Sequence, residues 1–270
     1  MVAPSPTAGA SNGYTLPMDE QAPTPTGPRN RHIYLLPNLL TTANMFAGFY
    51  AILAAANGQF VAACVAVLVA AVFDGLDGRV ARMTGTTSAF GVQYDSLCDL
   101  LSFGVAPALV MYHWALAQFV LDGAVWAKVG WGAAFLYVAC AALRLARFNV
   151  QAGSTDKRWF IGLASPASAA AMIAVVWFFT ERGHGGDALR WVALAVTVAC
   201  ALLMVSRIRF FSFNGWPGER VPFWFLLLVL AVFVALLIDT ASVIFGVAAV
   251  YLASGPVGWL WSRRRGAGMA

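Results

Sequence analysis

Long apolar segments separated by short polar breaks occupy most of the chain. Each segment is close to the roughly 20 residues that a helix needs to cross the hydrocarbon core of a bilayer. They lack the alternation of apolar and polar positions that is typical of a membrane β-barrel. The pattern predicts an all-α polytopic membrane protein with eight transmembrane helices, at residues 38–56, 59–76, 91–112, 124–146, 161–180, 187–206, 222–238 and 240–260.

The two ends of the chain differ from this membrane domain. Residues 1–28 contain six prolines together with Ser, Thr, Gly and Ala, a composition that cannot bury enough apolar surface to fold. They lack the basic and apolar regions of a cleavable signal peptide, so we expect the first transmembrane helix to direct insertion. The predicted organisation is a disordered tail at 1–28, a transmembrane domain at 29–262 and a basic tail at 263–270.

Basic residues are distributed unevenly between alternate loops of the predicted bundle. Lys128, Arg182 and Arg190 fall on one side, and the other 14 of the 17 basic residues fall on the opposite side. Lysine and arginine are held on the cytoplasmic side of membrane proteins. We therefore expect both termini in the cytoplasm and an even number of spans.

Composition excludes several classes of protein. With 60% apolar and 11% charged residues, the chain is too hydrophobic for a soluble globule, and a net charge of +5 is too small to predict nucleic-acid binding. The cysteines, Cys64, Cys98, Cys140 and Cys200, are widely spaced within apolar segments. We interpret them as small buried residues, since neither a disulfide framework nor a zinc site has this spacing.

Four of the 12 acidic residues, Asp74, Asp77, Asp95 and Asp99, lie at the cytoplasmic ends of the second and third predicted helices. Unpaired carboxylates are costly there. Each pair has helical spacing of three or four residues and projects from one face, and the short connection turns the two faces together. We expect the four carboxylates to converge.

Converging carboxylates require positive charge nearby. An all-oxygen set without His or Cys suits a hard divalent cation, and the ligand count matches two ions of Mg²⁺ or Mn²⁺. Salt bridges to Arg79 and Arg82, or a proton relay in a transporter, are alternative interpretations. A transporter is disfavoured because the two halves show no inverted repeat and no matching pair of broken helices.

The residues around these aspartates form a motif of fixed spacing. The chain reads DGLDGRVAR at 74–82 and GVQYDSLCD at 91–99, with eight residues between them. This fills every specified position of DxxDGxxAR-x8-GxxxDxxxD and resembles the signature of the CDP-alcohol phosphotransferases, which are polytopic membrane enzymes. The resemblance implies a homodimer in which an alcohol displaces CMP at the phosphorus of a CDP-linked lipid donor.

The resemblance also implies roles for the motif residues. Asp74, Asp77 and Asp95 would bind the cations, and Asp99 would be a further ligand or the general base that takes the proton of the acceptor hydroxyl. The remaining specified residues suit a nucleotide pocket. The small Gly78 and Ala81 would let the nucleotide approach the backbone and Arg82 would pair with the diphosphate, whereas Gly75 and Gly91 are alternatively helix-packing residues.

Further segments resemble the bacterial and archaeal phosphatidylserine synthase subfamily. Residues 37–48 are similar to PNxxTxxNxxxG, 102–107 to SFGxAP, 144–149 to RLARFN, and 162–167 to GLPSPxA with Ala164 in place of proline. The resemblance covers about residues 37–170. In the first segment, Asn38 and Thr41 lie on one helical face and are expected to contact CDP-diacylglycerol, or alternatively to cap the first helix.

Two arginines are candidates for binding the acceptor alcohol. Arg144 and Arg147 lie one turn apart at a helix end on the side of the aspartates, where either could bind the carboxylate of L-serine. Both are alternatively anchors that reach lipid phosphates. The resemblance implies transfer from CDP-diacylglycerol to L-serine at the cytoplasmic face of a bacterial cell membrane, in contact with membrane lipids. Glycerol 3-phosphate, inositol phosphate and choline are the alternative acceptors.

Overall fold

The computed structural model describes residues 35–85, 88–151, 159–211, 230 and 234–266. The labelled α-helices in these ranges are α1 (Leu35–Ala56), α2 (Phe60–Thr84), α3 (Ala89–Asp99), α4 (Ala106–Trp114), α5 (Ala124–Gln151), α6 (Ser165–Glu181), α7 (Gly186–Val205) and α9 (Thr240–Gly266). A π-helix, η2 (Leu100–Val105), joins α3 to α4, and a 3-10 helix, η3 (Leu116–Asp122), precedes α5. Strands β1 (Trp159–Ile161) and β2 (Arg209–Phe211) pair antiparallel, with Phe160 opposite Phe210.

Six helical segments of the described residues are long and apolar enough to cross a membrane, and α6 is a shorter apolar helix of 17 residues. The chain is therefore a multi-pass membrane protein, and its predicted helical character is confirmed. Seven of the eight predicted segments coincide with helices. The other segment, 222–238, lies mostly outside the described residues, so the count of eight spans and the orientation of the termini stay predictions. The tail predicted at 1–28 also lies outside the described residues.

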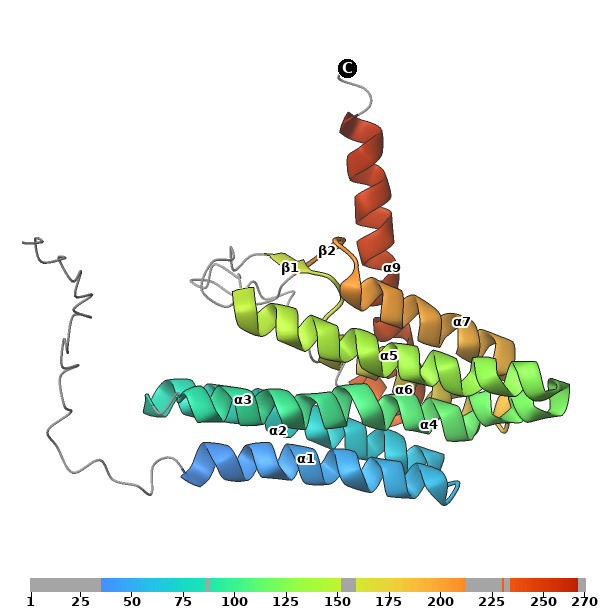
Figure 1. The fold of residues 1–270 in the computed structure, drawn as a ribbon, viewed down its shortest axis with the longest axis horizontal. Coiled ribbons are helices and arrows are strands. Elements are labelled where there is room, and N and C mark those ends of the chain that lie inside the picture. Colours follow the sequence, from blue (N-terminus) through green and yellow to red (C-terminus); the bar gives the residue numbers. More distant parts are fainter. Residues whose placement is uncertain (1–34, 86–87, 152–158, 212–229, 231–233, 267–270) are drawn as a thin grey trace, which may run out of the picture. The chain divides into compact units, whose positions relative to one another are not determined.

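Helices α1 to α7, with α3 and α4 in one span, run in alternating directions along one axis, and α9 stands at a steep angle to them (Figure 1). Consequently α2 ends, α3 begins, α5 ends and α6 begins at the same end of the bundle. We call this the aspartate end. The end at which α4 ends and α7 begins is the opposite end.

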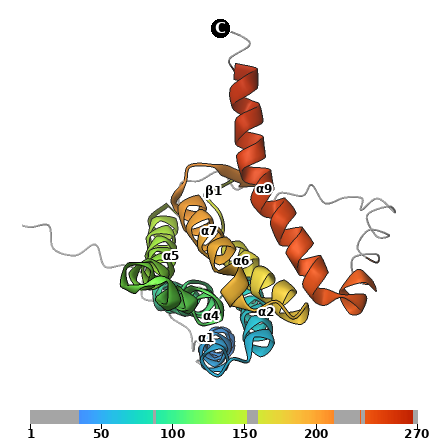
Figure 2. The ribbon, with the colours of Figure 1, turned by 90° about the vertical axis from the view of Figure 1, so that its right-hand side faces the viewer.

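Helix α6 is enclosed by other helices of the bundle. It contacts α2, α4, α7 and α9, and the view along the bundle shows it between α2, α7 and α9 (Figure 2). Ten of its 17 residues are buried. A helix surrounded by other helices is apolar on every side, which explains the absence of a polar face between Pro166 and Phe179.

Helices α1 and α2 pack against each other, and both bury alanine side chains. Ala47, Ala51 and Ala54 of α1 and Ala63 and Ala70 of α2 are all buried. Small side chains let membrane helices approach closely, since association there depends on packing and polar contacts more than on the hydrophobic effect. All four cysteines are also buried and free, as predicted.

Helix α2 is longer than the sequence pattern predicts. The apolar window ends at residue 76, but the helix continues to Thr84 and is capped by Gly85, whose left-handed backbone (φ 62°) lets its N–H donate to the carbonyl of Ala81. Arg79 and Arg82, which follow the predicted end of this span and are thus expected in the next loop, therefore lie within the helix. The prediction was wrong because a helix can continue into polar surroundings after its apolar stretch ends.

The short β1–β2 pair is also absent from the predicted elements. Strands of three residues are too short to show a periodicity of two. The predicted fifth helix, expected from residue 161, begins at Ser165 because β1 occupies residues 159–161.

Candidate functional site

Three of the four predicted metal-binding aspartates lie together at the aspartate end. Asp74 comes from α2, and Asp95 and Asp99 come from α3. One carboxylate oxygen from each lies within 4.8 Å of the others. The four-residue spacing places Asp95 and Asp99 on one face of α3, and the turn after α2 brings that face to Asp74. We call these residues the aspartate cluster.

The fourth aspartate, Asp77, is not in the aspartate cluster. Its side chain is buried, with 4% of the residue exposed, and its Oδ2 accepts a hydrogen bond from Thr41. It lines the same pocket as Asp95. The structure thus places three carboxylates together and Asp77 nearby, and the role of each as a ligand stays a prediction.

The aspartate cluster fits a hard divalent cation. The Oδ1 atom of Asp95 is buried and has no hydrogen-bond partner among the described residues. The salt bridges among the described residues lie at the opposite end of the bundle. They join Arg182 to Asp239 and Arg190 to Asp122. The alternative of ion pairing with the arginines of α2 therefore has no support. Adjacent carboxylates with a free buried oxygen are donors that Mg²⁺ or Mn²⁺ would use.

Helix α1 supplies two hydrogen bonds to the aspartates. Thr41 Oγ1 donates to Asp77 Oδ2 at 2.7 Å, and Asn44 Nδ2 donates to Asp99 Oδ1 at 3.2 Å. These contacts are absent from the sequence-based predictions, although the three-residue spacing of Asn38, Thr41 and Asn44 indicates a shared helical face. The alternative of Asn38 and Thr41 as caps is wrong, because α1 begins at Leu35 and both lie inside it.

A pocket of about 210 Å³ opens beside the aspartates. All five residues predicted to bind the CDP-linked donor line it, together with two of the aspartates. The lining residues are Pro37, Asn38, Thr41, Asp77, Gly78, Ala81, Arg82, Ser88, Gly91, Val92 and Asp95. Ser88 also caps α3, since its Oγ accepts a hydrogen bond from the N–H of Gly91 at 3.0 Å. The structure thus gathers residues from three helices around one pocket, with small residues and an arginine suited to a nucleoside diphosphate.

Replacing Gly78 with alanine is expected to weaken donor binding without disturbing the fold. A Cβ atom at Gly78 would meet no atom within 4 Å, so the methyl group would project into the pocket and occupy space needed by the nucleotide. We expect the KM for CDP-diacylglycerol to rise roughly 10-fold or more. Gly75→Ala is the matched control, because Gly75 is equally open but does not line the pocket, and it should keep the parent KM. Equal KM values for both variants would contradict the assignment of Gly78.

Arg144 lies near the aspartate cluster, within α5. Its Nη1 donates to Ser165 Oγ at 3.0 Å, and it is within Coulombic range of Asp99. Its Nε is buried and has no partner among the described residues. Arg147 lies one turn further and is half-buried. Arg144 therefore has a buried donor without a partner among the described residues, as expected of a residue that binds an anionic group.

Known proteins resemble the chain over most of its length. The model of the CDP-alcohol phosphatidyltransferase family matches residues 34–203. A relative in Helicobacter pylori, named CDP-diacylglycerol–serine O-phosphatidyltransferase, is 35% identical over 229 residues, which cover 85% of this chain and 92% of the relative. A Mycobacterium tuberculosis protein of the same name is 36% identical over 189 residues, 68% of this chain and 63% of that protein. An archaetidylserine synthase of Methanothermobacter thermautotrophicus is 35% identical over 184 residues, 67% and 71% of the two chains.

The chain belongs to the CDP-alcohol phosphatidyltransferase family. The region matched by the family model runs from the start of α1 into α7 and contains every candidate site residue. This family depends on divalent metal ions, and the aspartate cluster supplies suitable ligands. Helix α9 lies outside the matched region.

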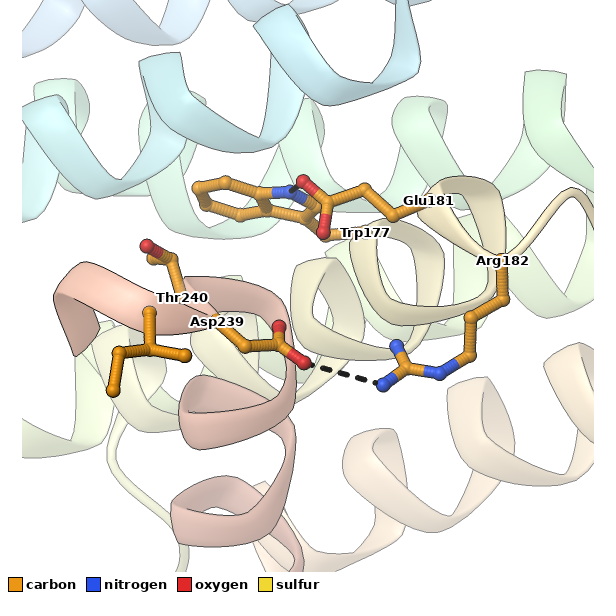
Figure 3. Close-up of a pocket in the computed structure, with 6 residues that line it drawn as sticks. Trp177, Glu181, Arg182, Asp239 and Thr240 are labelled. Carbon is orange, nitrogen blue, oxygen red and sulfur yellow. Dashed lines mark hydrogen bonds and ion pairs between the residues drawn. The ribbon is translucent and has the colours of Figure 1, made fainter. Parts of the chain in front are cut away.

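A second hollow, of about 470 Å³, lies at the opposite end between α6 and the start of α9 (Figure 3). Its polar side chains bond to one another: Trp177 Nε1 donates to Glu181 at 2.6 Å, and Arg182 lies 3.4 Å from Asp239. Hydrogen bonds from the hydroxyl and N–H of Ser242, and then Arg182, lower the pKa of Asp239. Because these groups already bond to each other, we assign the family's chemistry to the smaller pocket at the aspartate end.

Proposed function

We propose that the chain transfers the phosphatidyl group of CDP-diacylglycerol to the hydroxyl of L-serine, with phosphatidylserine and CMP as products. The observation that carries this proposal is the aspartate cluster beside a pocket lined by the motif residues. The names of relatives that are 35% and 36% identical supply the donor and the acceptor.

The reaction is a displacement at phosphorus. The serine oxygen forms a bond to the lipid-bearing phosphorus, the bond from that phosphorus to the oxygen of CMP breaks, and CMP leaves with the bonding electron pair. Asp99 accepts the proton of the serine hydroxyl. Two divalent cations, Mg²⁺ or Mn²⁺, when held by Asp74, Asp77, Asp95 and Asp99, would neutralise charge on the phosphate oxygens.

The other residues of the site bind and orient the substrates. Asn38, Thr41, Gly78 and Ala81 line the space for the nucleotide, and Arg82, at the same pocket, pairs with the diphosphate. In this proposal the carboxylate of serine is bound by the guanidinium of Arg144, with Arg147 as a second candidate.

The proposal also places the protein in its cell. The distribution of basic residues favours a site that opens to the cytoplasm, in the cell membrane of a bacterium. CDP-diacylglycerol is itself a membrane lipid, so a site at the end of the bundle, near the interface, gives access to its headgroup. We further propose that the chain works as a homodimer.

Release of CMP by the purified protein tests the acceptor. The protein is supplied with CDP-diacylglycerol, Mg²⁺ or Mn²⁺, and one of L-serine, glycerol 3-phosphate, inositol phosphate or choline. We expect CMP only with L-serine, because Arg144 offers a single cation for a carboxylate. Release with another alcohol would keep the mechanism and overturn the role of Arg144. Failure with every acceptor would contradict the proposed function.

A further inference from the structure

Helix α1 carries two buried polar side chains that bond to aspartates from other segments. Thr41 Oγ1 donates to Asp77, 36 positions away, and Asn44 Nδ2 donates to Asp99, 55 positions away. Only 5% of Thr41 and none of Asn44 is exposed. Polar groups are expensive inside a membrane bundle, so two that face carboxylates from the same helix require an explanation.

The orientation of the Asn44 amide follows from the chemistry of its partner. A carboxylate only accepts hydrogen bonds, so the amide nitrogen must face Asp99 and the amide oxygen must face away. That oxygen is buried and has no hydrogen-bond partner among the described residues. An unpaired buried acceptor lowers stability. Asn44 thus donates to Asp99 while its own amide oxygen stays without a partner among the described residues.

The backbone of α1 is held firmly against the segment that follows Asp99. Ser102 Oγ, in η2, donates to the carbonyl oxygen of Asn44 at 3.0 Å. One turn further along α1, a Cβ at Gly48 would lie 2.8 Å from the Ser102 Cα, so only glycine permits this approach. The two donors of α1 are thus fixed relative to the aspartates by contacts that do not involve the aspartates.

We propose that Thr41 and Asn44 are positioning residues, which hold Asp77 and Asp99 in the orientations that bind divalent cations. The inference rests on the proposed function, since it requires that these aspartates bind metal. Groups that hydrogen-bond to ligating carboxylates orient the ligand, and their loss weakens metal binding roughly 10- to 100-fold. Thr41 lines the pocket for the donor nucleotide and, in this proposal, its hydroxyl also orients a carboxylate.

The test is the binding of Mn²⁺ to the purified full chain without lipid substrate. Free Mn²⁺ is measured by its electron paramagnetic resonance signal, and the Kd is calculated from it. Thr41→Val keeps the shape of threonine but removes the hydroxyl, and we expect its Kd for Mn²⁺ to rise roughly 10- to 100-fold. Thr41→Ser keeps the hydroxyl and should restore most of the affinity. This rescue would show that the loss of affinity in Thr41→Val comes from the missing hydrogen bond and not from altered packing.

Thr42→Val is the matched control. The Thr42 hydroxyl bonds to the carbonyl of Asn38 at 2.7 Å and to the hydroxyl of Tyr94 at 2.9 Å, and it contacts no aspartate in these bonds. The same chemical change one position along the helix should leave the Kd for Mn²⁺ unchanged.

A double variant tests whether Thr41 acts through Asp77. Once Asp77→Asn has removed the carboxylate, the further change Thr41→Val should add little to the loss of affinity, because both changes remove the same interaction. Asn44→Leu extends the test to Asp99, with the same expected rise in Kd. Thr41→Val alone decides the matter if Asn44→Leu does not fold, as judged by thermal melting.

The outcomes separate this inference from the function on which it rests. Parent-like Mn²⁺ affinity of Thr41→Val, while the parent protein binds Mn²⁺, would overturn the positioning role and leave the proposed function standing. Additive losses in the double variant would also overturn it. A parent protein that binds no Mn²⁺ would contradict the proposed function itself.

Discussion

Replacing Asp99 with asparagine is expected to reduce turnover at least about 1000-fold while leaving the protein folded. The amide cannot take the proton of the serine hydroxyl. The amide oxygen can still accept the hydrogen bond that Asn44 donates to Asp99 at 3.2 Å. Removing one of three carboxyl groups whose oxygens lie within 4.8 Å of one another adds no repulsion in the metal-free protein, so stability should not fall.

The rate of CMP release at saturating L-serine and CDP-diacylglycerol measures this effect. Asp239→Asn is the matched control, because it makes the same change at the opposite end of the bundle, and its rate should equal that of the parent. Mn²⁺ binding then distinguishes the two roles of Asp99. If Asp99 is the base but not a ligand, the Kd of Asp99→Asn for Mn²⁺ should equal that of the parent. Retention of even about a tenth of the parent rate would exclude Asp99 as the base.

Replacing Arg144 with methionine is expected to lower kcat/KM for L-serine roughly 100-fold or more, with the KM for CDP-diacylglycerol unchanged. Methionine matches the length of the arginine stem but has no charge and no donor for a carboxylate. Arg144 lies within the apolar helix α5 and its Nε has no partner among the described residues. Replacing such a group with an apolar one is tolerated by many folds, so the loss should appear in serine recognition and not in stability.

Steady-state kinetics with serine as the varied substrate measure this prediction. Arg190→Met is the matched control, since Arg190 is also partly buried but pairs with Asp122 at the opposite end, and its serine kinetics should equal those of the parent. Arg147→Met decides between the two arginines. A large effect there, with kcat/KM for Arg144→Met within about twofold of the parent, would transfer the role to Arg147.

The course of the helices could be predicted from hydropathy because each span is a continuous apolar stretch of the required length. The end of α2 could not, since residues 77–84 are held in the helix by its own backbone hydrogen bonds and by the cap at Gly85, neither of which depends on apolar character. The β1–β2 pair also escaped prediction. It depends on pairing between residues about 50 positions apart, which a local pattern does not contain.

The site was predicted in its residues but not in its contacts. Helical spacing and the motif place the aspartates on shared faces, and the structure groups Asp74, Asp95 and Asp99. Asp77 lies outside that group, and its bond to Thr41 forms only after α1 packs against α2. Periodicity shows that Thr41 and Asn44 share a face. It does not show which carboxylate each one meets.

The π-helical residues Leu100–Val105 join α3 to α4 within one membrane span. They determine how α4 is rotated about the helix axis relative to α3. A π-turn takes one residue more than an α-turn, so α4 does not continue the face of α3 on which Asp95 and Asp99 lie. If the same six residues adopted α-helical geometry, α4 would rotate by about 100° relative to α3, which would displace the buried Val110 and Met111 from their packing. Chimaeras that exchange α3 between family members are therefore expected to assemble only when these six residues are transferred together with Asp99.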